Sequence, residues 1–260
     1  MSIWASGDLY EPYVGRWSRL VATEFVRWLD LPGGARWLDV GCGTGALSRA
    51  VLDLAAPSSL AGIDPSEGYV AYAHEHLGGP SASFAVGDAQ SLDFPNGSFD
   101  AVVSGLVLNF LADSPAGLTE MMRVTRPGGT VAIYVWDYAG KMELMRYFWD
   151  AAGQIDPAAI ELDEGRRFPI CNPQSLGDLF RAAGLGNVAT TAIDVPTHFR
   201  DFDDYWQPFL GAQGPAPGYA MSLDEDRRAA LRERIRAALP IADDGSIPLI
   251  ARAWAIKGLA

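Results

Sequence analysis

Three glycines at alternate positions follow a short apolar segment that carries an acid near its end. Residues Trp37–Gly45 read W-L-D-V-G-C-G-T-G, and a helical pattern continues over Ala46–Leu54. Glycine is favoured where the backbone takes a positive φ or must touch a ligand with no side chain between them. Small molecules bind at the carboxyl ends of parallel strands, which is where Asp39 falls. The pattern predicts a strand, a ligand-binding loop and a helix start. The glycines of this loop are Gly41, Gly43 and Gly45.

A second acid ends the next predicted strand. The segment Leu60–Asp64 is apolar up to its last residue, and Asp64 lies about twenty residues after the glycines. In dinucleotide-binding folds an acid at that distance binds the two ribose hydroxyls. Pro65 and Ser66 predict a helix start, because proline is preorganised for the first turn and serine can cap it. The two acids thus predict one binding edge for a ligand that contains a ribose.

Three further motifs lie at predicted strand boundaries: G-D-A-Q at 87–90, P-x-x-S-F-D-x-V at 95–102 and R-P-G-G at 126–129. The first follows a predicted strand at 82–86, and the last predicts a tight turn ahead of a strand at 130–136. In order and spacing, the five motifs resemble those of the class I S-adenosylmethionine (SAM) dependent methyltransferases. The chain looks most like their small-molecule branch, near the bacterial ubiquinone and menaquinone biosynthesis enzymes.

The resemblance implies an α/β fold: a Rossmann-like three-layer αβα sandwich with a seven-stranded, mostly parallel sheet, an antiparallel last strand and helical lid insertions. Helix and strand patterns alternate from Leu20 to Trp136, which also predicts a parallel sheet. The implied organisation is a single methyltransferase domain over 1–260, with an N-terminal helical cap at 1–30, a SAM-binding core at 36–136, and substrate-lid insertions at 137–172 and 196–222.

After Trp136 the alternation of patterns breaks. The stretch from 156 to Pro169 is polar and predicts a loop. The Arg-rich stretch at 223–239 carries apolar residues at helical spacing and predicts a solvated amphipathic helix. The remaining predicted elements are helices at 141–155 and 174–183 and strands at 188–195 and 247–256.

The resemblance also implies a cofactor and its binding residues. SAM is the expected methyl donor and S-adenosylhomocysteine the expected product. Asp64 is expected to bind both ribose hydroxyls, and Asp88 to accept from the exocyclic amine of adenine while the next backbone N–H serves a ring nitrogen. The implied binding residues are Asp39, Gly41, Cys42, Gly43, Gly45, Asp64, Pro65, Ser66, Asp88, Ala89, Gln90, Ser104 and Leu106.

Three residues have two interpretations each. Arg16 is predicted to pair with the methionine carboxylate of SAM through a bidentate fork, or else with surface acids. His198 is a candidate general base in a lid segment, or a packing or surface residue. Asn109, after the fourth predicted strand, is a candidate for orienting the methyl acceptor, or it caps local backbone.

Net charge and composition limit the classes of binding partner that we expect. The net charge of −12 argues against nucleic acid, because phosphate binding needs a positive field. The longest apolar runs are strand-sized, so no membrane span is expected, and the N-terminus lacks a signal-peptide pattern. Cys42 and Cys171 are expected to be free thiols in a reducing cytoplasm, and no metal site is expected. The expected partner is a small organic acceptor, and the expected state is a monomer or homodimer.

Two other function classes stay open. An NAD(P)-dependent oxidoreductase shares the G-x-G-x-x-A pattern and the acid after the second strand. Its chemistry uses a Tyr and a Lys four residues apart, whereas Tyr138 and Lys141 are three apart. A non-catalytic SAM-binding protein would share every motif, because a fold does not fix a function.

Overall fold

The computed structural model describes residues 15–211 and 214–260. Arg16 is therefore described, whereas residues 1–14 of the predicted N-terminal cap lie outside. The helices are α2 (Arg16–Leu29), α3 (Ala46–Leu54), α4 (Glu67–Leu77), α5 (Ser114–Val124), α6 (Glu143–Ile155), α7 (Glu164–Arg167), α8 (Pro173–Ala182), α9 (Phe202–Trp206), α10 (Pro215–Ser222) and α11 (Glu225–Ala238), with the short 3-10 helices η2 (Leu108–Phe110), η3 (Pro157–Leu162) and η4 (Gln207–Leu210). The strands are β1 (Arg36–Val40), β2 (Ser59–Asp64), β3 (Ala82–Val86), β4 (Phe99–Gly105), β5 (Thr125–Trp136), β6 (Gly186–Phe199) and β7 (Ile247–Leu259).

The chain forms two compact units. The sheet unit comprises Ser18–Val135, Asn172–Ile193 and Ala253–Ala260. The helical unit comprises Trp136–Cys171, Asp194–Arg252 and the described residues up to Trp17. Strands β5, β6 and β7 each contribute residues to both units. The predicted insertions at 137–172 and 196–222 fall almost entirely within the helical unit, which also contains α11.

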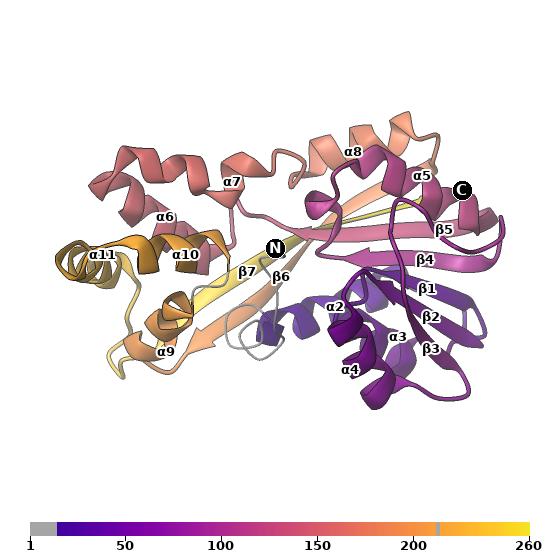
Figure 1. The fold of residues 1–260 in the computed structure, drawn as a ribbon, viewed down its shortest axis with the longest axis horizontal. Helices are drawn as coiled ribbons and strands as arrows, with labels where there is room; N and C mark the ends of the chain where they lie inside the picture. The colour runs from indigo at the N-terminus through magenta and orange to yellow at the C-terminus, as the bar shows by residue number, and fades with distance from the viewer. Residues whose placement is uncertain (1–14, 212–213) are drawn as a thin grey trace. The chain divides into compact units, whose positions relative to one another are not determined.

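The seven strands lie in the order β3-β2-β1-β4-β5-β7-β6. Strands β1 to β5 pair in parallel, with Asp39 opposite Gly62 of β2 and Val103 of β4. Strand β7 is antiparallel to β5: Gly128 N donates to Ala260 O, and further along the chain Asp137 N donates to Arg252 O. Figure 1 shows α3 and α4 on one side of β1–β4 and α5 and α8 on the other. The predicted α/β fold is confirmed.

Local sequence explains where the elements of the sheet unit begin. Helix α3 starts directly after Gly45, whose φ of +93° ends the glycine loop. Ser66 caps α4 by accepting from Tyr69 N, as the Pro-Ser pair predicts. Asp113 caps α5 in the same way, through Ala116 N. The predicted bounds of α3 and β3 match those of the structure to the residue.

Two predictions about strand ends are wrong. Arg126–Gly129 is not a turn ahead of β5 but lies inside it: the pairing with β4 moves from Phe99–Thr125 to Ala101–Thr130, so these four residues form a bulge. The strand predicted at 188–195 ends too early, because β6 continues to Phe199. The added residues include Pro196, which an edge strand tolerates.

The helical unit is built around aromatic side chains. Phe148 of α6 stacks on Phe209 at 4.6 Å between ring centroids, and the buried Tyr205 hydroxyl donates to Leu144 O. The predicted helices at 141–155 and 223–239 are confirmed as α6 and α11. The stretch predicted as a loop up to Pro169 instead contains η3 and α7, each capped by an Asp side chain.

Three features of the described residues bear on the predicted partners. In this part of the chain no helix is both long and apolar enough to cross a membrane. The same residues contain no cluster of three or more His, Cys, Asp or Glu arranged for a metal ion. Cys42 and Cys171 are buried free thiols.

Candidate cofactor site at the glycine loop

The three loop glycines all have positive φ, but their surroundings differ. At Gly41 (φ +75°) an added Cβ would meet Val107 Cγ2 at 2.4 Å, and at Gly45 (φ +93°) it would meet Leu77 Cδ1 at 2.4 Å. At Gly43 (φ +52°) no atom lies within 4 Å of that position. Gly41 and Gly45 are therefore needed for packing, whereas Gly43 presents bare backbone to open space. Such a position suits close contact with a ligand.

Backbone hydrogen bonds tie the loop to the end of β2. The N–H groups of Gly41 and Cys42 both donate to Ile63 O at 2.8 Å, and Gly45 N donates to Cys42 O. Gly43 N donates to Asp64 Oδ2 at 3.0 Å. The loop is therefore held in shape before any ligand binds, which lowers the entropy cost of binding.

Asp64 is the buried acid that joins the loop to the next helix. Its Oδ2 accepts from Gly43 N, and its Oδ1 accepts from Ser66 N at 2.9 Å. Burial raises the pKa of Asp64, while the Ser66 and Gly43 N–H groups lower it. Each carboxylate oxygen has two lone pairs, so Asp64 can also accept from two ligand hydroxyls. Pro65, which follows it, is exposed.

Asp39 is fully buried, with no exposed surface. Its Oδ2 accepts from Ser48 Oγ of α3 at 2.7 Å, and its Oδ1 has no hydrogen-bond partner among the described residues. Burial is the largest cause that raises the pKa of Asp39 to about 7; Ser48 lowers it in part, and the charge of Asp64 raises it further. Asp39 therefore lies beneath the loop rather than on its open face.

The neighbouring Cys42 thiol is not a nucleophile. Burial, with the charges of Asp39 and Asp64, raises its pKa well above the ordinary value. A thiol attacks as its thiolate, so this group stays protonated and unreactive. The loop is thus suited to binding rather than to covalent chemistry.

The turn after β3 has an ordered shape. Asp88 is exposed, and its Oδ1 accepts from Gln90 N at 2.9 Å, which forms an Asx turn. Gln90 Oε1 accepts from Asp113 N at 2.7 Å and so fixes the start of α5. Ala89 is buried between them. Asp88 retains acceptor capacity toward a ligand, whereas the Gln90 oxygen already has a partner.

Four residues of the site lie at or after the end of β4. Ser104, Leu106 and Asn109 were predicted from the sequence, and Val107 was not. Ser104 is buried and donates to Val40 O at 2.7 Å, so its hydroxyl joins β4 to β1. Leu106 has a φ of +63°, a left-handed conformation that is rare for leucine. The turn at Leu106 leads to Val107, which packs on Gly41. Asn109 follows in η2 with 9% exposure, and its Nδ2 has no hydrogen-bond partner among the described residues.

Arg16 and His198 belong to the helical unit. Arg16 Nη1 pairs with Asp204 Oδ1 at 3.3 Å, and its guanidinium lies 4.3 Å from the centroid of the Trp17 ring and 4.7 Å from that of Phe199. His198 is exposed on β6, where the alternate residues are buried. This part of β6 belongs to the helical unit. Their roles toward a ligand stay predictions.

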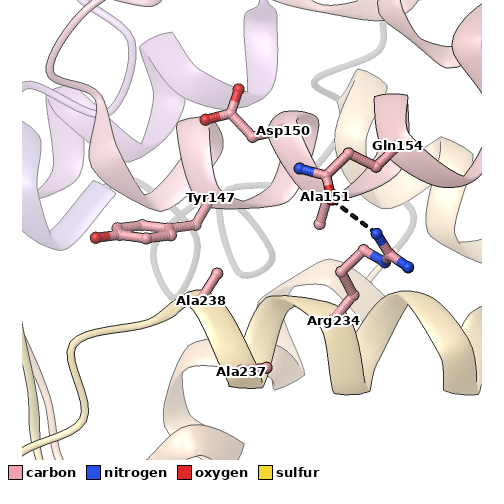
Figure 2. Close-up of a pocket in the computed structure, with 7 residues that line it drawn as sticks. All are labelled: Tyr147, Asp150, Ala151, Gln154, Arg234, Ala237 and Ala238. Atoms are coloured by element: carbon pink, nitrogen blue, oxygen red, sulfur yellow. Dashed lines mark hydrogen bonds between the residues drawn. The ribbon is translucent and has the colours of Figure 1, made fainter.

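The helical unit also contains an open hollow of about 330 Å³ between α6 and α11. Figure 2 shows Arg234 of α11 beside Gln154 of α6, and its Nη1 donates to Gln154 Oε1 at 2.7 Å. The remaining lining of the hollow is Tyr147, Asp150, Ala151, Ala237 and Ala238. None of the predicted site residues lines this hollow.

Three residues of the site were not predicted. Ser48 is the partner of Asp39, Val107 covers Gly41, and Tyr69 lies close enough to Asp64 for that charge to raise its pKa, after the larger effect of burial. A signal existed for Ser48, since it is a polar residue on the otherwise apolar side of α3. Val107 and Tyr69 carry no such signal.

The hydrogen-bonding groups at this edge of the sheet fit SAM. The open space at Gly43, the acceptor oxygens of Asp64 and Asp88, and the buried amide of Asn109 lie at or shortly after the carboxyl ends of β1 to β4. Ligands of parallel α/β sheets bind at this edge. The structure brings the predicted cofactor residues of the sheet unit together.

Comparison with known proteins agrees with this geometry. A methyltransferase domain family matches residues 38–133. The 2-methyl-6-phytyl-1,4-hydroquinone methyltransferase of Synechocystis sp. is 33% identical over 189 residues, 71% of this chain and 57% of that protein. The demethylmenaquinone methyltransferase of Anoxybacillus flavithermus is 31% identical over 176 residues, 62% of this chain and 73% of that protein.

Solved structures extend the likeness of the fold beyond the matched segment. The YcgJ protein of Bacillus subtilis has a TM-score of 0.61 at 18% identity, covering 92% of this chain and 97% of that one. The chain spans a little over half the length of the Synechocystis relative. With the five motifs, the sheet order and these relatives in agreement, the chain belongs to the class I SAM-dependent methyltransferases.

Proposed function

We propose that this protein transfers the methyl group of SAM directly to a small organic acceptor. The observation that carries the proposal is the bare backbone at Gly43, held by Asp64 beside an open space. SAM supplies a methyl group already activated by a sulfonium. The protein's own task is then to align the reactants and exclude water.

The residues of the sheet unit divide that task. Asp64 would accept from the ribose hydroxyls while it keeps the loop in place, and Asp88 would accept from the adenine amine. The unpartnered Nδ2 of Asn109 would donate to an oxygen of the acceptor. Arg16 as the partner of the methionine carboxylate and His198 as a proton acceptor are further parts of the proposal.

A hydroquinone is the acceptor class that the relatives favour. The Synechocystis relative is named for a phytyl hydroquinone, and other relatives for demethylmenaquinone. A phenol ring offers an oxygen for the Asn109 amide and, when ionised, an electron-rich carbon or oxygen for methylation. Cytoplasmic location, with both cysteines free, and a monomeric or homodimeric state complete the proposal.

Thermal unfolding with SAM, S-adenosylhomocysteine and NAD tests the cofactor. SAM and its product should raise the Tm, because a ligand that binds only the folded state stabilises it by mass action. A shift with NAD and none with SAM would favour an oxidoreductase. SAM binding without methylation of any hydroquinone, phenol or amine in a mass-spectrometric panel would favour the non-catalytic alternative.

The role of Asp64 can be tested by calorimetry. Asp64→Ala should weaken SAM binding by on the order of 2–3 kcal/mol, because hydrogen bonds to a charged acceptor are lost and donors are left unpaired. Asp93→Asn, at an exposed acid outside the loop, is the control and should bind SAM as the wild type does. Unchanged affinity in Asp64→Ala would remove the ribose assignment.

A further inference from the structure

Asp39 and Ser48 form a buried polar pair beneath the glycine loop. Asp39 comes from the end of β1 and Ser48 from the first turns of α3, and both have no exposed surface. The 2.7 Å contact between Ser48 Oγ and Asp39 Oδ2 leaves Asp39 Oδ1 without a partner in the described residues. An ionised carboxylate with one oxygen unsatisfied is costly in such a place.

The charges around the pair are all negative or neutral. The charge of Asp64 from β2 acts on Asp39, and the charges of both carboxylates act on the Cys42 thiol of the loop. Burial and then the charge of Asp64 raise the pKa of Tyr69 of α4. Within the described residues no salt bridge joins Asp39 or Asp64 to a Lys, Arg or His. Two carboxylates thus flank the loop, and no cation of the described residues forms an ion pair with either of them.

We propose that Asp39 and Ser48 hold a proton beneath the glycine loop in the free protein and release it when the cofactor binds. The inference rests on the proposed function, because SAM carries an ammonium and a sulfonium. A cation that binds near a buried carboxylate favours its ionised form. The proton leaves Asp39 for the solvent, and Ser48 Oγ continues to donate to the ionised Oδ2.

The position of Asp39 on the pH scale makes the effect measurable. Its pKa of about 7 in the free protein means that the acid is largely protonated at about pH 6 and largely ionised at about pH 8. SAM binding should therefore release nearly one proton at about pH 6 and almost none at about pH 8. The Kd for SAM should fall about tenfold across this range from Asp39 alone.

Isothermal titration calorimetry in two buffers of different ionisation enthalpy measures both quantities. Asp39→Asn keeps the shape of the side chain and an acceptor for Ser48 but cannot ionise, so the released proton and the tenfold change should disappear. The amino group of SAM itself titrates in this range, and it contributes equally to both proteins. The difference between the two proteins therefore isolates Asp39.

Ser48→Ala provides a second, independent variant. Without the hydroxyl donor the ionised form is less stable, so the midpoint of proton release should move to higher pH. Ser104→Ala is its matched control: it also removes a buried hydroxyl with a 2.7 Å bond to β1, but one that donates to a backbone carbonyl. It should lower stability without moving that midpoint. Should Asp39→Asn fail to fold, the comparison of these two serine variants decides the question.

The outcomes separate this inference from the proposed function. Equal proton release and equal pH dependence in the wild type and Asp39→Asn, with both binding SAM, would overturn the inference and leave the proposed function standing. The same midpoint in Ser48→Ala as in the wild type would also overturn it. A folded wild type that binds no SAM at any pH would overturn the proposed function, and the inference with it.

Discussion

Replacing Gly43 with alanine should separate ligand contact from folding. Its φ of +52° is left-handed, a conformation that costs a residue with a Cβ roughly 1–2 kcal/mol. No atom lies within 4 Å of the new methyl group, so no clash adds to this strain. The free energy of unfolding should therefore fall by about 1–2 kcal/mol. SAM affinity should fall by on the order of tenfold or more, because the methyl group occupies the space where the ligand meets the backbone.

Gly34 offers a matched control in the same unit. Its φ is +82°, and an added Cβ there also meets nothing within 4 Å, but it lies in the turn before β1 rather than in the glycine loop. Gly34→Ala should show the same loss of stability as Gly43→Ala with unchanged SAM affinity. Any difference in affinity between the two variants then reports ligand contact and not backbone strain.

Gly41 and Gly45 complete the series. Both combine positive φ with a 2.4 Å contact, so Gly41→Ala should cost about 2–5 kcal/mol once overpacking is added to strain. Gly45→Ala should cost less, because Leu77 Cδ1 is the far end of a flexible side chain, whereas the β-branched Val107 is stiff. Urea unfolding measures the stabilities and calorimetry the affinities. Wild-type SAM affinity in Gly43→Ala would refute the assignment of Gly43 as the contact with the ligand.

Two further predictions concern strain and a buried acid. Leu106→Gly should be about 1 kcal/mol more stable than Leu106→Ala, the reverse of the usual order, because only glycine adopts φ +63° without strain. Urea unfolding measures both variants, and the control pair Leu108→Gly and Leu108→Ala should show the usual order. Equal stabilities of the two Leu106 variants would contradict the prediction. Burial raises the pKa of Glu164 to about 7, above its unfolded value, so the folded state binds the extra proton and wild-type stability should fall as pH rises from about 4 to about 7. Glu164→Gln keeps an acceptor for Trp149 Nε1 and should lose this fall. The free energy of unfolding of the variant, relative to that of the wild type, should therefore be on the order of 2–3 kcal/mol higher at about pH 8 than at about pH 4. Parallel stability–pH curves for the two proteins would contradict the prediction.

The sheet unit could be predicted from sequence because its signals are local. The three glycines, the Pro-Ser helix start and the apolar strands each specify a conformation within a few residues. The surroundings of Asp39 could not be predicted, because its neighbours come from α3, β2 and β4, which are separate in sequence. The contact between Gly41 and Val107 joins residues far apart in sequence, so no local sequence pattern predicts it.

The sequence at the end of β6 contains a strand pattern that continues beyond the predicted end at 195. Ile193, Val195, Thr197 and Phe199 alternate with exposed residues, which is the pattern of a half-buried strand. Pro196 lies inside this pattern, and an edge strand tolerates proline because one of its two sides has no neighbouring strand. Whether a strand lies at the edge depends on the order of all strands in the sheet. A local sequence pattern therefore could not show that proline is tolerated at this position.

The two bonds accepted by Asp64 have a consequence for redesign. One carboxylate fixes both the glycine loop, through Gly43 N, and the first residues before α4, through Ser66 N. A substitution meant to change which ribose derivative the protein accepts would also release these two backbone groups. Specificity and architecture at this position therefore cannot be altered one at a time. A new preference would have to be introduced from η2, where the backbone N–H groups of Phe110 and Leu111 bond to backbone carbonyls and the Nδ2 of Asn109 has no partner among the described residues.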